Sequence, residues 1–84
     1  MTYMWKISDG TYRFQTTNSN VSKKLKKIQK IELISFGMNS FNEIYQIKLE
    51  NIDIAKQILK DVTGNEIYRS GEGFLAKEQM GLKL

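Results

Sequence analysis

The sequence contains no cysteine, no histidine and no proline. Without cysteine the chain has no disulfide and no thiolate metal site, and without histidine it lacks the commonest metal ligand and general base. Its serine and threonine hydroxyls have no imidazole to activate them as nucleophiles. The acidic residues show no spacing that forces two carboxylates together, and the Gly71-Glu72-Gly73 segment lacks the lysine and hydroxyl of a phosphate-binding loop. We therefore expect a protein that is not an enzyme and binds neither a metal nor a cofactor.

Long apolar runs are missing as well. No segment approaches the roughly 20 apolar residues of a membrane span, and the N-terminal MTYMWKISDG lacks the apolar run of a signal peptide. The charged fraction of 26% is that of an ordinary globular protein. We expect one cytoplasmic domain over residues 1–84 that does not bind membranes. The abundance of lysine, isoleucine and asparagine is typical of AT-rich genomes, such as those of low-GC bacteria and their phages.

Acidic residues are absent between Asp9 and Glu32. This segment contains one arginine and five lysines, a charge of +6 in a chain of formal net charge +4, so the remainder sums to −2. A basic surface confined to one segment indicates an anionic partner more strongly than a high isoelectric point does. The basic residues of the segment are Arg13, Lys23, Lys24, Lys26, Lys27 and Lys30.

The first elements expected are two strands, Tyr3–Ile7 and Tyr12–Thr16, joined in a β-hairpin. The Asp9-Gly10 pair between them is a strong signal for a two-residue turn. Directly opposed residues of a hairpin share a face. Pairing outward from this turn places four apolar side chains on one face: Trp5, Ile7, Tyr12 and Phe14.

The stretch from Asn18 to about Gln29 has the pattern of an amphipathic helix. Asn18, Ser19 and Asn20 all offer side-chain oxygens for an N-cap, and Val21, Leu25 and Ile28 recur at the spacing of one helix face. The lysines of this stretch fall on the opposite side, which predicts a basic helix face. The later elements expected are strands Ile31–Phe36 and Asn42–Leu49, helix Asn51–Thr63 with a stop at Gly64, and a hairpin of Glu66–Ser70 with Phe74–Lys77.

Two parts of the chain align without a gap at an offset of 33 residues. Tyr12 aligns with Tyr45, and Asn18 aligns with Asn51. The repeat predicts an α+β domain built from two ββα units and a C-terminal hairpin. Its antiparallel sheet would carry both helices on one face, with the strands that begin at Tyr12 and Asn42 in the centre. The alternative is a ferredoxin-like βαββαβ arrangement with an extra N-terminal strand.

The two faces of this sheet are expected to differ in character. The face toward the helices would bury the aromatic and branched side chains of the hairpin together with Tyr45 and Ile47. If the alternation were inverted, Tyr12, Phe14 and Tyr45 would instead form a platform for stacking bases. The side chains expected on the open face are polar and basic: Lys6, Arg13, Gln15, Gln46 and Lys48.

The basic helix gives the first functional hypothesis, a small protein that binds DNA or RNA. Lysines contact phosphates without reading bases, so binding would be non-specific and sensitive to salt. Reversing the helix lysines to glutamate would then abolish it. The candidate contact residues are Arg13, Lys23, Lys24, Lys26, Lys27, Lys30 and Lys48.

The second hypothesis is a small, phage-encoded regulator or inhibitor that binds another protein. It would dock its basic face on an acidic or nucleic-acid-binding surface of a larger protein. Met38 and Phe41 lie in the loop Gly37–Phe41, where two large apolar side chains at a hairpin tip are suited to anchoring a partner. A partner that is retained after nuclease treatment would distinguish this hypothesis from the first.

Overall fold

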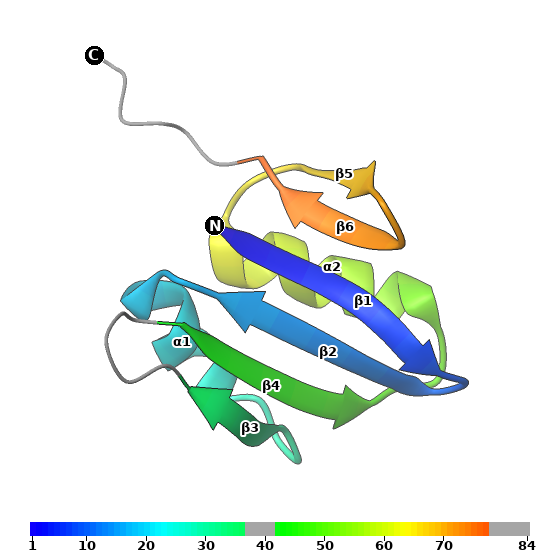
Figure 1. Ribbon diagram of the computed structural model, residues 1–84, viewed down its shortest axis with the longest axis horizontal. Coiled ribbons are helices and arrows are strands. Elements are labelled where there is room, and N and C mark those ends of the chain that lie inside the picture. The colour runs from blue at the N-terminus through cyan, green and yellow to red at the C-terminus, as the bar shows by residue number, and fades with distance from the viewer. Residues whose placement is uncertain (37–41, 78–84) are drawn as a thin grey trace.

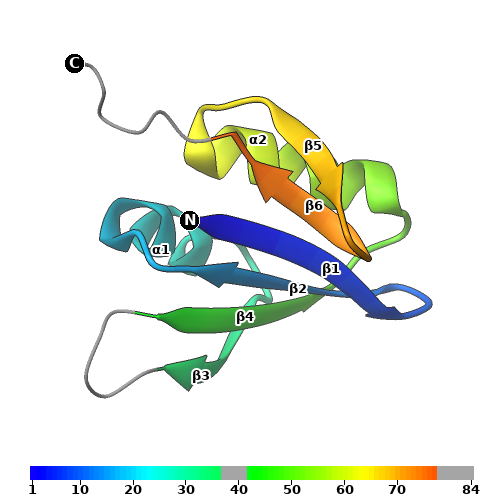
Figure 2. The ribbon, with the colours of Figure 1, turned by 45° about the horizontal axis from the view of Figure 1, so that its top comes forward.

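The computed structural model describes residues 1–36 and 42–77 and contains one antiparallel sheet with two helices on one face (Figures 1 and 2). The six strands lie in the order β3-β4-β2-β1-β6-β5. The predicted α+β class is therefore confirmed. The elements are β1 (Thr2–Ser8), β2 (Thr11–Thr16), α1 (Ser19–Lys26), β3 (Glu32–Phe36), β4 (Glu43–Lys48), α2 (Ile52–Thr63), β5 (Ile67–Ser70) and β6 (Gly73–Ala76).

The centre of the sheet follows the sequence repeat. β2 pairs with β4 so that Arg13 lies opposite Gln46, Tyr12 opposite Ile47 and Phe14 opposite Tyr45. Arg13 and Gln46 are themselves 33 positions apart, so a pseudo-twofold axis between them exchanges the two ββα units. β1 occupies the place beside β2 that a ferredoxin-like arrangement gives to its last strand. The element order therefore agrees with two ββα units followed by a hairpin.

Both helices begin at asparagine caps, Asn18 among the three candidates at the first helix and Asn51 as predicted at the second. The Asn18 side chain accepts hydrogen bonds from the backbone N–H groups of Asn20 and Val21, and the Asn51 side chain accepts one from Ile54 N at 3.1 Å. Such bonds satisfy donors that the first helical turn leaves without partners.

The core lies between the sheet and the helices. Tyr12, Phe14, Tyr45 and Ile47 are buried there, so the prediction of their facing is confirmed and the inverted alternation is wrong. The predicted C-terminal hairpin is present as β5 paired with β6. The loop Gly37–Phe41, with Met38 and Phe41, lies outside the described residues.

The first hairpin departs from the predicted register. Ser8 pairs with Thr11 as expected, but an irregularity between Lys6 and Ser8 shifts all earlier pairs by one residue. Met4 therefore faces Phe14 in the core and is fully buried, while Trp5 lies opposite Arg13. A one-residue bulge moves every side chain beyond it to the other face, because side chains alternate with a period of two. The prediction that Trp5 and Ile7 join the core was wrong.

Helix α1 is shorter than the sequence pattern predicts. It ends at Lys26, and the next residues form tight turns in which Lys27 N donates to Lys24 O and Ile28 N donates to Leu25 O. Lys30, two residues before the start of β3, adopts a left-handed backbone conformation with φ of 70°. The chain must reverse here to enter β3, so Lys30 belongs to the turn and not to the helix.

Candidate functional site

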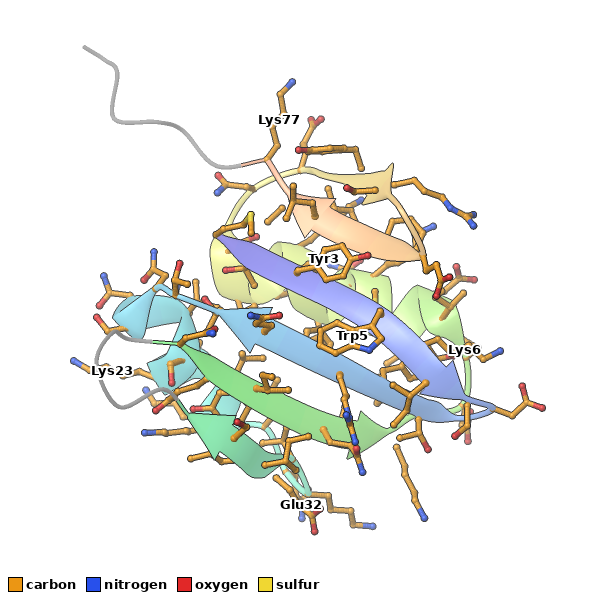
Figure 3. The ribbon with its side chains drawn as sticks, viewed as in Figure 1. Tyr3, Trp5, Lys6, Lys23, Glu32 and Lys77 are labelled. Atoms are coloured by element: carbon orange, nitrogen blue, oxygen red, sulfur yellow. The ribbon has the colours of Figure 1, made fainter. Side chains whose placement is uncertain are left out.

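Four of the predicted contact residues form a lysine face on α1 and its C-cap residue, which we define as Lys23, Lys24, Lys26 and Lys27. All four side chains are exposed, and Lys23 projects away from the sheet (Figure 3). None of them forms an ion pair within residues 1–36 and 42–77, where the ion pair present joins Lys6 to Asp9 at 3.1 Å. The lysine face is therefore available to an external anion.

The position of these lysines also has a structural role. Lys23, Lys24 and Lys26 lie in the last turn of α1. Cations are stabilising there because the helix dipole leaves partial negative charge at the C-terminus. On the opposite side of the helix, Val21, Ser22 and Leu25 are buried. This anchoring fixes the direction in which the lysine face points.

The other three predicted contact residues, Arg13, Lys30 and Lys48, do not join the lysine face. Arg13 lies on the open face of the sheet, where its Nε donates a 2.8 Å hydrogen bond to Gln46 Oε1. Lys30 and Lys48 line a hollow of about 290 Å³ together with Gln46 and Glu32. The structure thus separates the predicted residues into one group on α1 and another along the sheet.

Two aromatic side chains that the sequence analysis assigned to no site lie on the open face. Tyr3 and Trp5 project from β1 toward the viewer in Figure 3, and their ring centroids are 5.6 Å apart with planes inclined by 28°. Both side chains are partly exposed. The Tyr3 hydroxyl donates to Ser70 O at 2.8 Å, which holds its ring in place. Tyr3 and Trp5 share a strand face because they are two residues apart. The bulge between Lys6 and Ser8 places that face on the open side of the sheet.

A partly buried polar cluster joins α1 to the sheet. Tyr45 Oη donates to Glu43 Oε1 at 2.5 Å, and the Ser22 hydroxyl donates to the same oxygen. Burial alone would raise the pKa of Glu43, but these two hydrogen bonds and the nearby charge of Lys26 lower it below 4.5. Burial, together with Glu43, raises the pKa of Tyr45 to about 12. An ionised carboxylate with a lowered pKa is a weak base, so we interpret the cluster as structural.

Replacing Glu43 by glutamine should cost about 1–2 kcal/mol of unfolding free energy at pH 7, because Ser22 and Tyr45 lose a charged acceptor. A carboxyl whose folded pKa is lowered stabilises the fold above its unfolded pKa, and that contribution is lost as pH falls through the folded pKa. The difference in unfolding free energy between wild type and Glu43→Gln should therefore become smaller below pH 4.5. Urea unfolding of both proteins at pH 7 and pH 3 measures this difference. Glu66→Gln, which changes an exposed carboxylate in the same way, is the control. An equal difference at both pH values would contradict this interpretation.

No protein-family model matches this chain, and no curated protein or solved structure is significantly similar to it. Neither helix in the described part of the chain is long and apolar enough to cross a membrane. Within the same residues, no three acidic side chains gather to hold a metal ion.

Proposed function

We propose that this is a small, non-enzymatic, cytoplasmic nucleic-acid-binding protein whose lysine face contacts the phosphate backbone. The observation that supports the proposal is the exposure of Lys23, Lys24, Lys26 and Lys27 without an ion pair in the described residues. Exposed ammonium groups can exchange their water and counterions for phosphates.

The lysine face suits backbone contact better than base recognition. Lysine is a point charge that binds phosphates, whereas specific contacts to base edges most often come from arginine. Val21, Ser22 and Leu25 hold α1 against the sheet. The helix backbone that carries the lysines is therefore ordered before binding, and binding does not have to include the entropy cost of ordering it. We expect low sequence specificity on this surface, with affinity dominated by counterion release.

Binding to duplex DNA should therefore weaken steeply with salt. Four phosphate contacts give a slope of roughly −3.6 for the logarithm of the association constant against the logarithm of salt concentration, since each contact contributes about −0.9. Fluorescence anisotropy with a labelled duplex, measured between 50 and 400 mM NaCl, gives the slope directly.

A slope near zero, or no binding at low salt, would contradict the proposal. The proposal would also be contradicted if the chain retained a stoichiometric acidic protein from a nuclease-treated lysate and had no affinity for purified nucleic acid. That result would favour a protein partner.

A further inference from the structure

We infer that the open face of the sheet is a second contact surface, which binds single-stranded nucleic acid by stacking unpaired bases on Tyr3 and Trp5. The inference rests on the proposed function. It adds that this surface distinguishes single-stranded from duplex nucleic acid. It is carried by an aromatic pair and by cations that lie near that pair. Within residues 1–36 and 42–77, moreover, both helices lie on the other face of the sheet (Figures 2 and 3).

The aromatic pair is built as a fixed platform. β1 lies between β2 and β6, so both rings stand away from the edges of the sheet. The hydrogen bond from the Tyr3 hydroxyl to Ser70 O restrains one ring, and that ring packs on Trp5. Gly73 lies opposite Trp5 on β6 and has no side chain to cover the rings. Rings that are restrained and partly exposed lose little entropy when a base stacks on them.

Groups able to contact a base edge surround the rings. Tyr3, Trp5, Gln15 and Glu72 line one hollow of about 360 Å³. The Gln15 side-chain amide, which donates to Asn42 Oδ1 at 3.1 Å, still offers its carbonyl oxygen and a second N–H. The Glu72 carboxylate repels phosphate but accepts hydrogen bonds from the amino groups of bases. The hollow therefore favours a base over a phosphate.

Cations continue from the rings across the sheet. Arg13 lies directly opposite Trp5, and Gln46 lies directly opposite Arg13. Neighbouring strands lie about 4.8 Å apart, so the two steps from Trp5 through Arg13 to Gln46 span roughly 10 Å. Gln46 lines the hollow that also contains Lys30 and Lys48. Arg13, Lys30 and Lys48 give three positive charges along this path, against the negative charges of Glu32 and Glu72. A strand with bases on the rings can thus place its phosphates near the cations.

Duplex nucleic acid fits this surface less well. Bases in a duplex are stacked on one another and cannot lie on an aromatic ring without being unstacked. Aromatic stacking combined with cations that follow the backbone is the usual mode of binding single strands without sequence preference. The open face of the sheet and the lysine face therefore have different tasks, the first for unpaired bases and the second for phosphates in either form.

The single tryptophan of the chain makes the test direct. Adding an unstructured oligonucleotide, such as a 12-nucleotide dT or rU strand, should quench the emission of Trp5. Stacking is worth about 1–3 kcal/mol per base, so Trp5→Leu and Tyr3→Leu should each weaken single-strand binding roughly 5- to 150-fold. Trp5→Phe keeps an aromatic ring and should keep most of the affinity. None of these variants should weaken duplex binding by more than about twofold.

The outcomes separate the inference from the function on which it rests. If duplex binds but Trp5 emission and the Trp5→Leu affinity for single strands do not change, the inference is overturned and the proposed function stands. If neither form binds, both fail. If Trp5→Leu weakens single-strand and duplex binding equally while its circular dichroism and melting temperature stay those of wild type, the platform has no special role for unpaired bases and the inference also fails.

Discussion

Reversing Lys23 and Lys27 to glutamate should weaken duplex binding about 100-fold at low salt and make the salt slope about two units shallower. Each reversal removes one phosphate contact and adds a carboxylate that repels the backbone. The two positions lie one helical turn apart and are exposed, so the core is untouched. Lys26 is left in place because its charge acts on Glu43, and a second carboxylate there would weaken the cluster that holds α1.

The control for this experiment is the pair Lys60→Glu and Lys77→Glu. Lys60 occupies on α2 the position that Lys27 occupies after α1, and both control residues are exposed. Either double variant lowers the formal net charge by four units, from +4 to zero. Lys56 is not used because its ammonium group lies 4.9 Å from the centroid of the Phe74 ring. Equal loss of affinity in both variants would show that overall charge, and not the lysine face, drives binding.

The parts of the fold that were predictable from sequence depend on local rules. Asn18 and Asn51 cap their helices through side-chain oxygens, which is a property of the residue and its neighbours. The left-handed Gly64 ends α2 for the same kind of reason. The repeat could also be predicted from the sequence. Residues that a pseudo-twofold axis exchanges are separated by the constant offset of the repeat, as Arg13 and Gln46 are.

The facing of β1 was not predictable by the same means. Thr2 and Met4 alternate with Tyr3 and Trp5, so either set can face the core, and the larger aromatic residues were the natural choice. Which set is buried depends on the bulge near Ile7. β1 also packs against β6 and α2, which are more than 40 residues away in the sequence, so its facing involves contacts that local rules do not capture. A one-residue error of register hid the aromatic pair on the open face.

The division of the basic residues was hidden for a similar reason. The lysines of residues 23–30 look like one helical stripe, since hydrophobic spacing continues to Ile28. α1 instead ends at Lys26, short of the expected end near Gln29, and Lys30 lies in the turn that leads to β3. Net charge therefore predicts an anionic partner, but it does not indicate how many separate surfaces carry the basic residues.

Replacing Gly73 by alanine should destabilise the fold more than any other single change considered. A Cβ atom at this position would lie 2.1 Å from the carbonyl oxygen of Met4 and 2.8 Å from Cζ and the hydroxyl oxygen of Tyr3. The first contact is with backbone and cannot be relieved by rotating a side chain. β6 must then move away from β1, and the pairing that carries the C-terminal hairpin is broken. We expect a loss of about 3 kcal/mol or more, out of a total on the order of 4–13 kcal/mol for a chain of this length.

Gly64→Ala is the matched control for Gly73→Ala. Gly64 has a φ of 69° and nothing within 4 Å of a Cβ atom, so alanine there meets only backbone strain. That strain costs about 1–2 kcal/mol. Urea denaturation followed by circular dichroism compares the two, and a Gly73→Ala cost no greater than the Gly64→Ala cost would contradict the register of β1 with β6. Because the displaced Tyr3 ring belongs to the stacking platform, any folded Gly73→Ala protein should also bind single strands more weakly while its lysine face still binds duplex.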